Sequence, residues 1–252
     1  MATEWIQVTP KLAKIVIQPG IRGKRFNFWA EIEIKLTNVD TTLVTVAQIP
    51  TDKPVKIQIG CADNEFSRII ELCVKLMDLG ESSKFKAQMS NREYIYFELS
   101  IINAINSSEP VHQWESSEII RVAQDLKSRG VDLYKEKRTC DAFYLFSEAV
   151  KFVIPLEVTF EKPSLQEQAE ASQESLLIRA ELSRLITSLY SNIAACHLQL
   201  HNYDPALQLS DQVLDRNPTE VKAVYRKACA LSGNLSLKKC SITIINIKSL
   251  QV

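Results

Sequence analysis

The second half of this 252-residue chain contains an internal repeat, which constrains its fold more than any single motif does. Ala228 lies 34 residues after Ala194, while Gly130 and Ala142 lie 64 residues before Ala194 and Ala206, respectively. The two 64-residue spacings agree, and each equals one 34-residue period plus 30 further residues. Small residues that recur at a fixed period mark places where repeated units approach closely. The spacing predicts three repeats with one insertion between the first and the second.

These repeats have the features of the tetratricopeptide repeat (TPR), a 34-residue pair of antiparallel helices. Small residues stand where the two helices meet, a large aromatic residue begins a helix, and a proline follows the second helix. From Glu115 onward the hydrophobic spacing is helical, so residues 116–252 are predicted to form an all-α TPR domain. The matching residues are Gly130, Ala142, Phe146, Ala149 and Pro155 in the first repeat, and Tyr190, Ala194, Ala206 and Pro218 in the second.

Two parts of the predicted TPR domain depart from this pattern. The insertion is assigned to residues 156–175, which either lengthen the flanking helices or form a loop. The third repeat is atypical, because the stretch CSITIINIKSLQV that begins at Cys240 is dense in β-branched residues, which disfavour helix. The last residues of the chain, about 15 of them, are therefore expected to be frayed, atypical or docked on a partner.

The first half of the chain alternates with a period of two instead. Apolar residues occupy every second position at 26–36, 55–59 and 95–101, as in strands with one buried face. Residues 63–80 have helical spacing and reach Gly80, a common helix stop. Residues 1–105 are thus predicted to form an antiparallel β-sheet with one short helix, and the polar segment 106–115 a linker. The fold class is therefore α+β.

The composition excludes several classes of function. The chain has 30 basic and 30 acidic residues, so charge gives it no reason to bind nucleic acid or an anionic membrane. There is no signal-peptide core and no apolar run of membrane-spanning length. The six cysteines are scattered without a CxxC pair, which indicates reduced thiols in the cytoplasm or nucleus. No metal site, cofactor motif or catalytic residue is predicted.

Four polar residues fall on the first helices of the three predicted repeats. They are Lys127 in the first repeat, Asn192 in the second, and Lys222 and Arg226 in the third. First helices line the concave groove of stacked repeats, so all four side chains can face one groove. Such a groove would hold an acidic, extended peptide by charge-assisted hydrogen bonds. The alternative is that these are ordinary solvated residues of the groove.

These four residues resemble the dicarboxylate clamp of chaperone-binding TPR domains. The resemblance implies that the groove binds the C-terminal Glu-Glu-Val-Asp of heat-shock protein 90. At one position the chain departs from that family, which usually has an asparagine directly after the glycine, where Val131 stands here. The missing amide is expected to weaken binding, because a hydrogen bond to a charged group contributes about 1.5–3 kcal/mol.

The whole chain is similar to the large immunophilins, which are FKBP-type peptidyl-prolyl isomerases with a chaperone-binding TPR tail. In the first half, the resemblance rests on a strand that ends at Gly60 and on a following helix. The family's helix carries an arginine, a glutamate, a methionine and a closing glycine, and here these positions hold Arg68, Glu71, Met77 and Gly80. The resemblance implies an FKBP-like β domain before the TPR domain.

The residues that form the family's catalytic pocket are changed. The tryptophan at the pocket floor falls on Ile70, and the glycine before it on Ile69. Only SNRE separates Met89 from Tyr94, so the overhanging loop of the family cannot form. Catalysis in this family depends on pocket shape and desolvation, so the domain is expected to be non-catalytic.

The resemblance therefore implies a scaffold or co-chaperone that joins a client to a chaperone. A protein kinase of the doubletime or casein kinase type is the client that it suggests. Two alternatives are left open: an active isomerase with an unusual pocket, and a TPR adaptor whose β domain is a structural cap. An isomerase would need an aromatic-floored cavity large enough for a drug-sized ligand.

Overall fold

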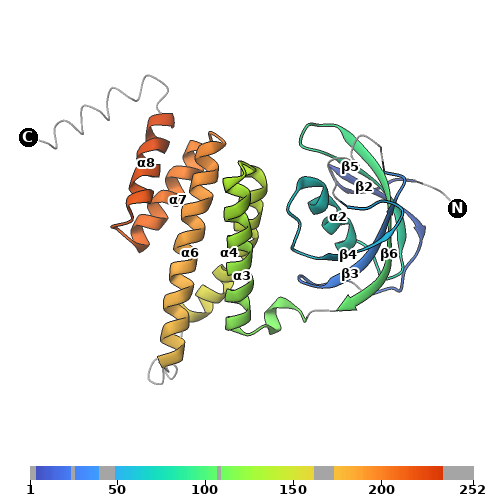
Figure 1. Ribbon diagram of the computed structural model, residues 1–252, viewed down its shortest axis with the longest axis horizontal. Coiled ribbons are helices and arrows are strands. Elements are labelled where there is room, and N and C mark those ends of the chain that lie inside the picture. Colours follow the sequence, from blue (N-terminus) through green and yellow to red (C-terminus); the bar gives the residue numbers. More distant parts are fainter. Residues whose placement is uncertain (1–3, 24–25, 40–48, 107–108, 162–172, 235–252) are drawn as a thin grey trace, which may run out of the picture. The chain divides into compact units, whose positions relative to one another are not determined.

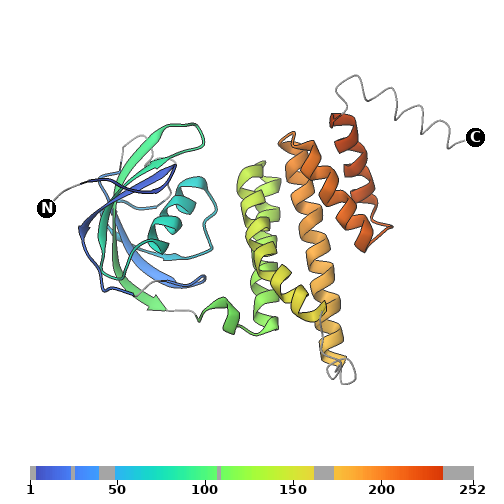
Figure 2. The same ribbon diagram turned by 180° about the vertical axis from the view of Figure 1, so that it is seen from behind.

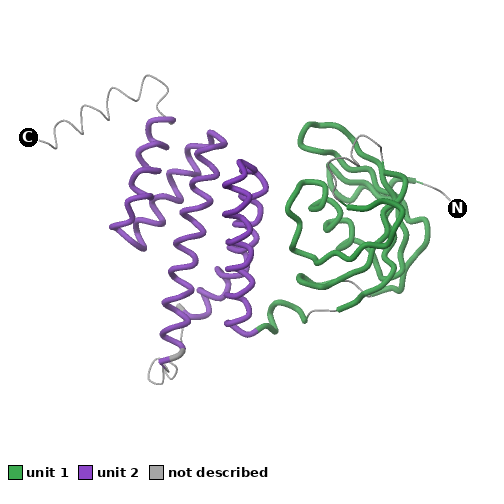
Figure 3. The backbone as a smooth tube through the Cα atoms, viewed as in Figure 1, with its two compact units in different colours: residues 1–114 green, residues 115–252 purple. Residues whose placement is uncertain are grey.

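The computed structural model describes residues 4–23, 26–39, 49–106, 109–161 and 173–234. The chain divides into two compact units, Met1–Trp114 and Glu115–Val252 (Figure 3). In the described residues, the first unit is an antiparallel sheet with one α-helix and a short 3-10 helix (Val111–Gln113), and the second unit is helical. The predicted α+β fold is confirmed.

Six strands of the first unit form one antiparallel sheet in the order β1-β2-β5-β6-β3-β4. One face of this curved sheet is covered by α2 (Glu65–Lys75), as Figure 1 shows. Strands β3, β5 and much of β6 bury every second residue, because successive side chains point to opposite faces. The strands are β1 (Ile6–Thr9), β2 (Leu12–Gln18), β3 (Glu31–Thr37), β4 (Pro54–Gln58), β5 (Ser82–Gln88) and β6 (Tyr94–Asn106).

The core of this unit lies between α2 and the sheet. Phe66 of α2 meets Phe97 of β6 edge to face, and Phe85 of β5 stacks on Phe97, with ring centroids 5.6 Å apart in both pairs. All three rings are buried, so their removal from water contributes much of the stability of the unit. The helix begins at Asn64, whose side chain accepts the N–H of Ser67 and so caps a free donor.

One strand in this unit begins later than the sequence predicts. The alternation from residue 26 to 36 predicts one continuous strand, but β3 begins at Glu31. Residues 28 and 29 form a turn instead, where Trp29 has a φ of 72° and its N–H donates to the carbonyl of Ile59 (2.9 Å). The carbonyl of Ile59, distant in sequence, thus stabilises a turn that the apolar spacing does not predict.

The helix of this unit also ends earlier than predicted. It stops at Lys75, not near Gly80, because Leu76 and Met77 donate to carbonyls three residues earlier and tighten the chain. Gly80 lies in the turn before β5 with a φ of 80°, a conformation that glycine adopts at no steric cost.

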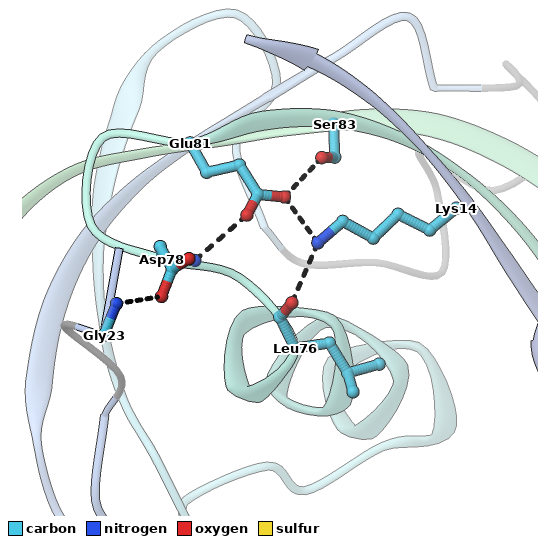
Figure 4. Close-up of polar contacts among 6 residues, drawn as sticks. All are labelled: Lys14, Gly23, Leu76, Asp78, Glu81 and Ser83. Atoms are coloured by element: carbon cyan, nitrogen blue, oxygen red, sulfur yellow. Dashed lines mark hydrogen bonds and ion pairs between the residues drawn. The ribbon is translucent and has the colours of Figure 1, made fainter. Parts of the chain in front are cut away.

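A buried ion pair connects β2 to the segment between α2 and β5 (Figure 4). The Nζ atom of Lys14 lies 2.6 Å from Oε1 of Glu81 and donates to the carbonyl of Leu76 (2.8 Å). The Glu81 carboxylate also accepts the hydroxyl of Ser83 (2.5 Å) and the backbone N–H of Asp78 (3.1 Å). Both charges are therefore compensated inside the unit, as a buried ion pair requires.

The second unit contains five α-helices among its described residues, and consecutive helices pack side by side (Figure 1 and Figure 2). Ala142, Ala194 and Ala206, which the repeat places at helix contacts, are fully buried. The two predicted helix pairs are therefore α3 with α4 and α6 with α7, and α8 begins the third repeat. The helices are α3 (Ser116–Lys135), α4 (Thr139–Glu161), α6 (Gln173–Gln199), α7 (Tyr203–Arg216) and α8 (Val221–Asn234).

Pro155 does not follow the second helix of its repeat, contrary to the prediction, but lies inside α4. The helix continues to Glu161, and its added turns make contacts: Leu156 is buried, and Glu157 pairs with Arg216 of α7. These contacts stabilise the extended helix and oppose the cost of a proline in a helix interior, which is about 3 kcal/mol. The insertion thus lengthens α4, and the 27-residue α6 begins within the predicted insertion at Gln173. Residues 162–172 lie outside the described part of the chain.

The third repeat is described only as far as α8. Ala228, the 34-residue counterpart of the buried Ala194, is exposed, because no helix follows α8 among the described residues. Residues 235–252, which include Cys240 and the segment expected to be frayed or docked, lie outside the described residues.

Candidate functional site

The four predicted groove residues lie on the first helix of each repeat. Lys127 is on α3, Asn192 is on α6, and Lys222 and Arg226 are one turn apart on α8. Helix α3 packs against α6, and α6 packs against α8, so these three helices adjoin one another. Close packing is possible because α8 turns small residues such as Ala223 inward, where it is buried.

Three of these four residues line a single cavity of about 460 Å³. It lies between α6, the C-terminal end of α7 and α8, and we call it the cationic cavity. Every residue of its lining is polar or charged, and four of them are cationic whereas one is acidic, so the cavity favours anions. The lining is Ser183, Arg184, Thr187, Ser188, Ser191, Asn192, Arg216, Asn217, Glu220, Lys222 and Arg226.

Lys127 is not among the residues that line this cavity. It is half-buried on α3, as is Val131 one turn farther along the same helix. The structure thus brings Asn192, Lys222 and Arg226 together and leaves Lys127 outside the cationic cavity.

Arg226 is a cation of the cavity that a contact with α6 holds in place. It is half-buried, and its Nη1 donates to the hydroxyl of Ser191 on α6. Burial lowers the pKa of Arg226, whereas nearby Tyr134 and Glu220 act in the opposite direction. A guanidinium stays protonated at any physiological pH, so Arg226 presents a permanent charge. Because it is already held in place, less side-chain freedom is lost when a ligand binds.

Arg216 is held by contacts within the protein. It forms two hydrogen bonds with the carboxylate of Glu157 (2.6 and 2.9 Å), and its guanidinium lies 5.7 Å from the ring centroid of Tyr190. Glu157 belongs to the turns of α4 beyond Pro155, so the insertion supports one wall of the cationic cavity. The repeat pattern alone did not single out Arg216, because its position depends on this contact between distant segments.

Arg184 is the other cation that sequence reasoning missed. It precedes Asn192 by eight residues on α6, which places both on the same helical face two turns apart. That spacing was a usable signal. It requires α6 to begin before Arg184, whereas the repeat pattern starts this helix near Tyr190.

A second cavity of about 720 Å³ adjoins the first, and both are lined by Lys222 and Arg226. Several of its other lining residues are aromatic or aliphatic, and Tyr225 and Val221 are largely exposed. An apolar surface beside two cations suits a peptide that combines apolar and acidic side chains. The other lining residues are Tyr134, Ala195, Leu198, Gln199, His201, Tyr203 and Cys229.

In the first unit, the two residues at the predicted pocket floor belong to the core. Ile70 is 1% exposed and lies in the cluster between α2 and the sheet, and the half-buried Ile69 packs against that cluster. The next residue, Glu71, is also buried and accepts the backbone N–H of Ala62 (2.7 Å). Burial raises the pKa of Glu71. This part of α2 therefore serves the packing of the unit.

The connection between β5 and β6 is a short turn, as the sequence predicts. The N–H of Met89 donates to the carbonyl of Glu93 (2.9 Å), which closes the turn. The carboxylate of Glu65, at the start of α2, accepts the N–H of Ser90 (2.7 Å). The turn is thereby tied to the helix.

The described residues show no group of three or more His, Cys, Asp or Glu that could hold a metal ion. In the same part of the chain, no helix is both long and apolar enough to cross a membrane. The five described cysteines are free thiols. Burial raises the pKa of Cys196 to about 12, so this thiol is protonated and unreactive at neutral pH.

Known proteins are similar to most of the chain, although no family model matches it. FK506-binding protein 5 of Rhizopus delemar is 27% identical over 192 residues, which cover 69% of this chain and 44% of that protein. The Hsp70/Hsp90 co-chaperone CNS1 of Saccharomyces cerevisiae is 32% identical over 127 residues, or 50% of this chain and 26% of that protein. The chain thus spans less than half the length of these relatives.

Among solved structures, the crystal structure of residues 1–211 of CG17282 is similar in fold. It aligns with a TM-score of 0.62 and 21% sequence identity, over 80% of this chain and 96% of that one. The alignment covers parts of both units, because neither unit alone amounts to 80% of the chain. The arrangement of a β unit followed by a helical unit is therefore shared.

Proposed function

We propose that this chain, a divergent FKBP-type immunophilin with a TPR domain, is a non-catalytic scaffold that binds the acidic C-terminus of a chaperone. The cationic cavity supports this role, because it contains Asn192, Lys222 and Arg226. A terminal carboxylate and a side-chain carboxylate would each receive charge-assisted hydrogen bonds there. The peptide would lie in the groove formed by α3, α6 and α8.

Heat-shock protein 90, which ends in Glu-Glu-Val-Asp, is the proposed source of this peptide. One relative is named as an Hsp70/Hsp90 co-chaperone, which supports a chaperone as the partner. The adjoining cavity supports it as well, because the exposed Val221 and Tyr225 could contact the valine of the peptide. The chain would act in the cytoplasm, and also in the nucleus.

Calorimetric titration with a Glu-Glu-Val-Asp peptide tests this binding. The full chain should bind with micromolar affinity that weakens as salt is raised, because the cations are partly exposed. Lys222→Ala and Arg226→Ala should each weaken binding roughly fivefold or more. Arg121→Ala is the matched control, since Arg121 is an exposed α3 cation that lines neither cavity. If the chain ignores the peptide at low salt, this function is excluded.

The first unit is proposed to bind protein without catalysing prolyl isomerisation. Two features support this: Ile70 is packed in the core at the position of the aromatic floor, and a short turn joins β5 to β6. The rival function, an active isomerase with an unusual pocket, is favoured by the similarity to FK506-binding proteins. NMR exchange on a proline peptide should show only uncatalysed isomerisation, with a time constant on the order of tens to hundreds of seconds. Catalysis that is lost when residues 1–114 are removed would establish the rival.

A protein kinase of the doubletime or casein kinase type is the proposed client of the first unit, on the strength of the family resemblance. Affinity capture from native extract, with and without a competing Glu-Glu-Val-Asp peptide, separates the two kinds of partner. The chaperone should be lost in the presence of the peptide, and the kinase should be retained. If no kinase remains, this client is excluded.

A further inference from the structure

We infer that the cationic cavity holds a second anion subsite at Arg184. This subsite binds the phosphate of a phosphorylated serine or threonine in the bound acidic peptide. The inference rests on the proposed function. The peptide would then be read at two places. Asn192, Lys222 and Arg226 would hold its carboxylates, and Arg184 would hold a phosphate several residues upstream.

The charges of the cavity leave Arg184 uncompensated. Of the four cations in the lining, Arg216 is paired with Glu157, and Arg226 interacts with Glu220, the one acid of the lining. Arg184 and Lys222 form no salt bridge with any described residue, and both are exposed. Lys222 belongs to the proposed carboxylate site. Arg184 is therefore the cation of the lining that lacks both a salt bridge with a described residue and an assigned anionic group of the Glu-Glu-Val-Asp peptide.

For a peptide that runs along α6 with its terminal carboxylate at Asn192, the position of Arg184 indicates which residue it would meet. Arg184, Ser188 and Asn192 recur every four residues on one face of α6. With a rise of 1.5 Å per residue, Arg184 lies about 12 Å along the helix from Asn192. An extended peptide advances about 3.3 Å per residue, so this distance equals three or four peptide residues. The residue just before Glu-Glu-Val-Asp falls in this range.

The chemistry of the lining favours a phosphate at this place. An arginine presents a planar fork of N–H donors that matches two phosphate oxygens. The hydroxyl of Ser188 and the amide of Asn217 line the same cavity and can add neutral donors. A phosphoserine carries a charge of about −1.5 to −2 at pH 7, more than a carboxylate, so the permanent charge of Arg184 attracts it more strongly.

The test compares two peptides that end in Ser-Glu-Glu-Val-Asp, one of them phosphorylated on the serine. Each is titrated by calorimetry into the full wild-type chain, into Arg184→Gln and into the control Arg121→Gln. Phosphorylation should tighten binding to the wild type and to the control by about tenfold. In Arg184→Gln the ratio of the two affinities should fall to about one, because the phosphate has lost its bidentate partner.

A third peptide, with its phosphoserine eight residues farther upstream, separates a local subsite from general charge attraction. It should bind like the unphosphorylated peptide. If it gains as much affinity, or if Arg184→Gln keeps the gain, the Arg184 subsite is excluded while the proposed function stands. If both Ser-Glu-Glu-Val-Asp peptides bind the wild type equally, the subsite is excluded in the same way. If neither binds, the proposed function itself is excluded, and the subsite with it.

Discussion

Gly130 on α3 is a place where two helices of the TPR unit, α3 and α4, approach closely. A Cβ atom there would lie 2.7 Å from a ring carbon of Phe146, which is buried on α4 and cannot move freely. Alanine would favour the helix itself by roughly 0.5–1 kcal/mol, but overpacking a core costs about 1–3 kcal/mol. The cost of overpacking should therefore exceed the gain in helix propensity, since the buried ring has little space to move.

Gly130→Ala should lower the free energy of unfolding of the TPR unit by about 1 kcal/mol or more. Urea denaturation followed by far-ultraviolet circular dichroism measures this. Ser128→Ala, at an exposed position of the same helix, should change it by less than about 0.5 kcal/mol. A Gly130→Ala variant as stable as the wild type would contradict the close approach of the two helices.

Glu71 should make the stability of the β unit depend on pH. Its Oε1 accepts the N–H of Ala62, whereas its buried Oε2 has no hydrogen-bond partner among the described residues. Burial raises the pKa of Glu71 above its ordinary value of 4.5, although backbone N–H groups and Lys75 oppose the rise. The folded state thus holds this proton more tightly than the unfolded chain. Its contribution to stability is full below pH 4.5 and is lost as the pH rises through the raised pKa.

Glu71→Gln stays neutral and keeps an acceptor for the N–H of Ala62. It should therefore remove the loss of stability that Glu71 causes as the pH rises. Unfolding in urea at several pH values between 4 and 8 measures the effect in both proteins. The stability of the wild type relative to Glu71→Gln should fall as the pH rises. Parallel pH profiles would show that Glu71 does not titrate differently in the folded and unfolded states.

The buried pair of Lys14 and Glu81 attaches one element of the β unit to another (Figure 4). It joins β2 to the segment after α2, and only 11% and 6% of the two side chains are exposed. Glu81→Gln would leave the Lys14 ammonium buried without a counter-charge, which should destabilise the unit by about 3–5 kcal/mol. Urea denaturation of the single variants and of Lys14→Met/Glu81→Gln measures the coupling. The double variant should lose less than the sum of the singles, and strict additivity would contradict the pairing.

The extended helix α4 shows how an insertion can take part in a binding site. The turns beyond Pro155 bring Glu157 to Arg216, and Arg216 lines the cationic cavity. Arg184, which lies on α6 beyond the end of the insertion, lines the same cavity. A TPR domain without this insertion would lack Glu157, so the insertion supports the Arg216 wall of the cationic cavity.

In the molecule as a whole, the two compact units are expected to be separately folded. Each has its own buried core, and β6 ends at Asn106, ten residues before α3 begins. Limited proteolysis should cut first near 103–115 or within 156–175, and a chain of residues 1–114 should keep the β-sheet spectrum in circular dichroism. A first cut inside β3, or an unfolded 1–114 fragment, would contradict independent units.

The sequence by itself determined the kind of element in each half and the pairing of the helices. Periods of two and of about 3.6 follow from the geometry of strands and helices, so they are visible without a structure. The 34-residue spacing likewise identified the helix contacts at Ala142, Ala194 and Ala206. It also placed Asn192, Lys222 and Arg226 on helices that adjoin, because repeats of one kind stack in one way.

Only the tertiary structure decided where elements stop and which further residues reach the cavity. The turn at Trp29 depends on a hydrogen bond to Ile59, thirty residues away, and the passage of α4 through Pro155 is accompanied by packing and an ion pair with α7. Arg216 likewise reaches the cavity with the support of its ion pair with Glu157, 59 residues away. Each of these features depends on contacts between segments distant in the chain, and local periodicity does not predict such contacts.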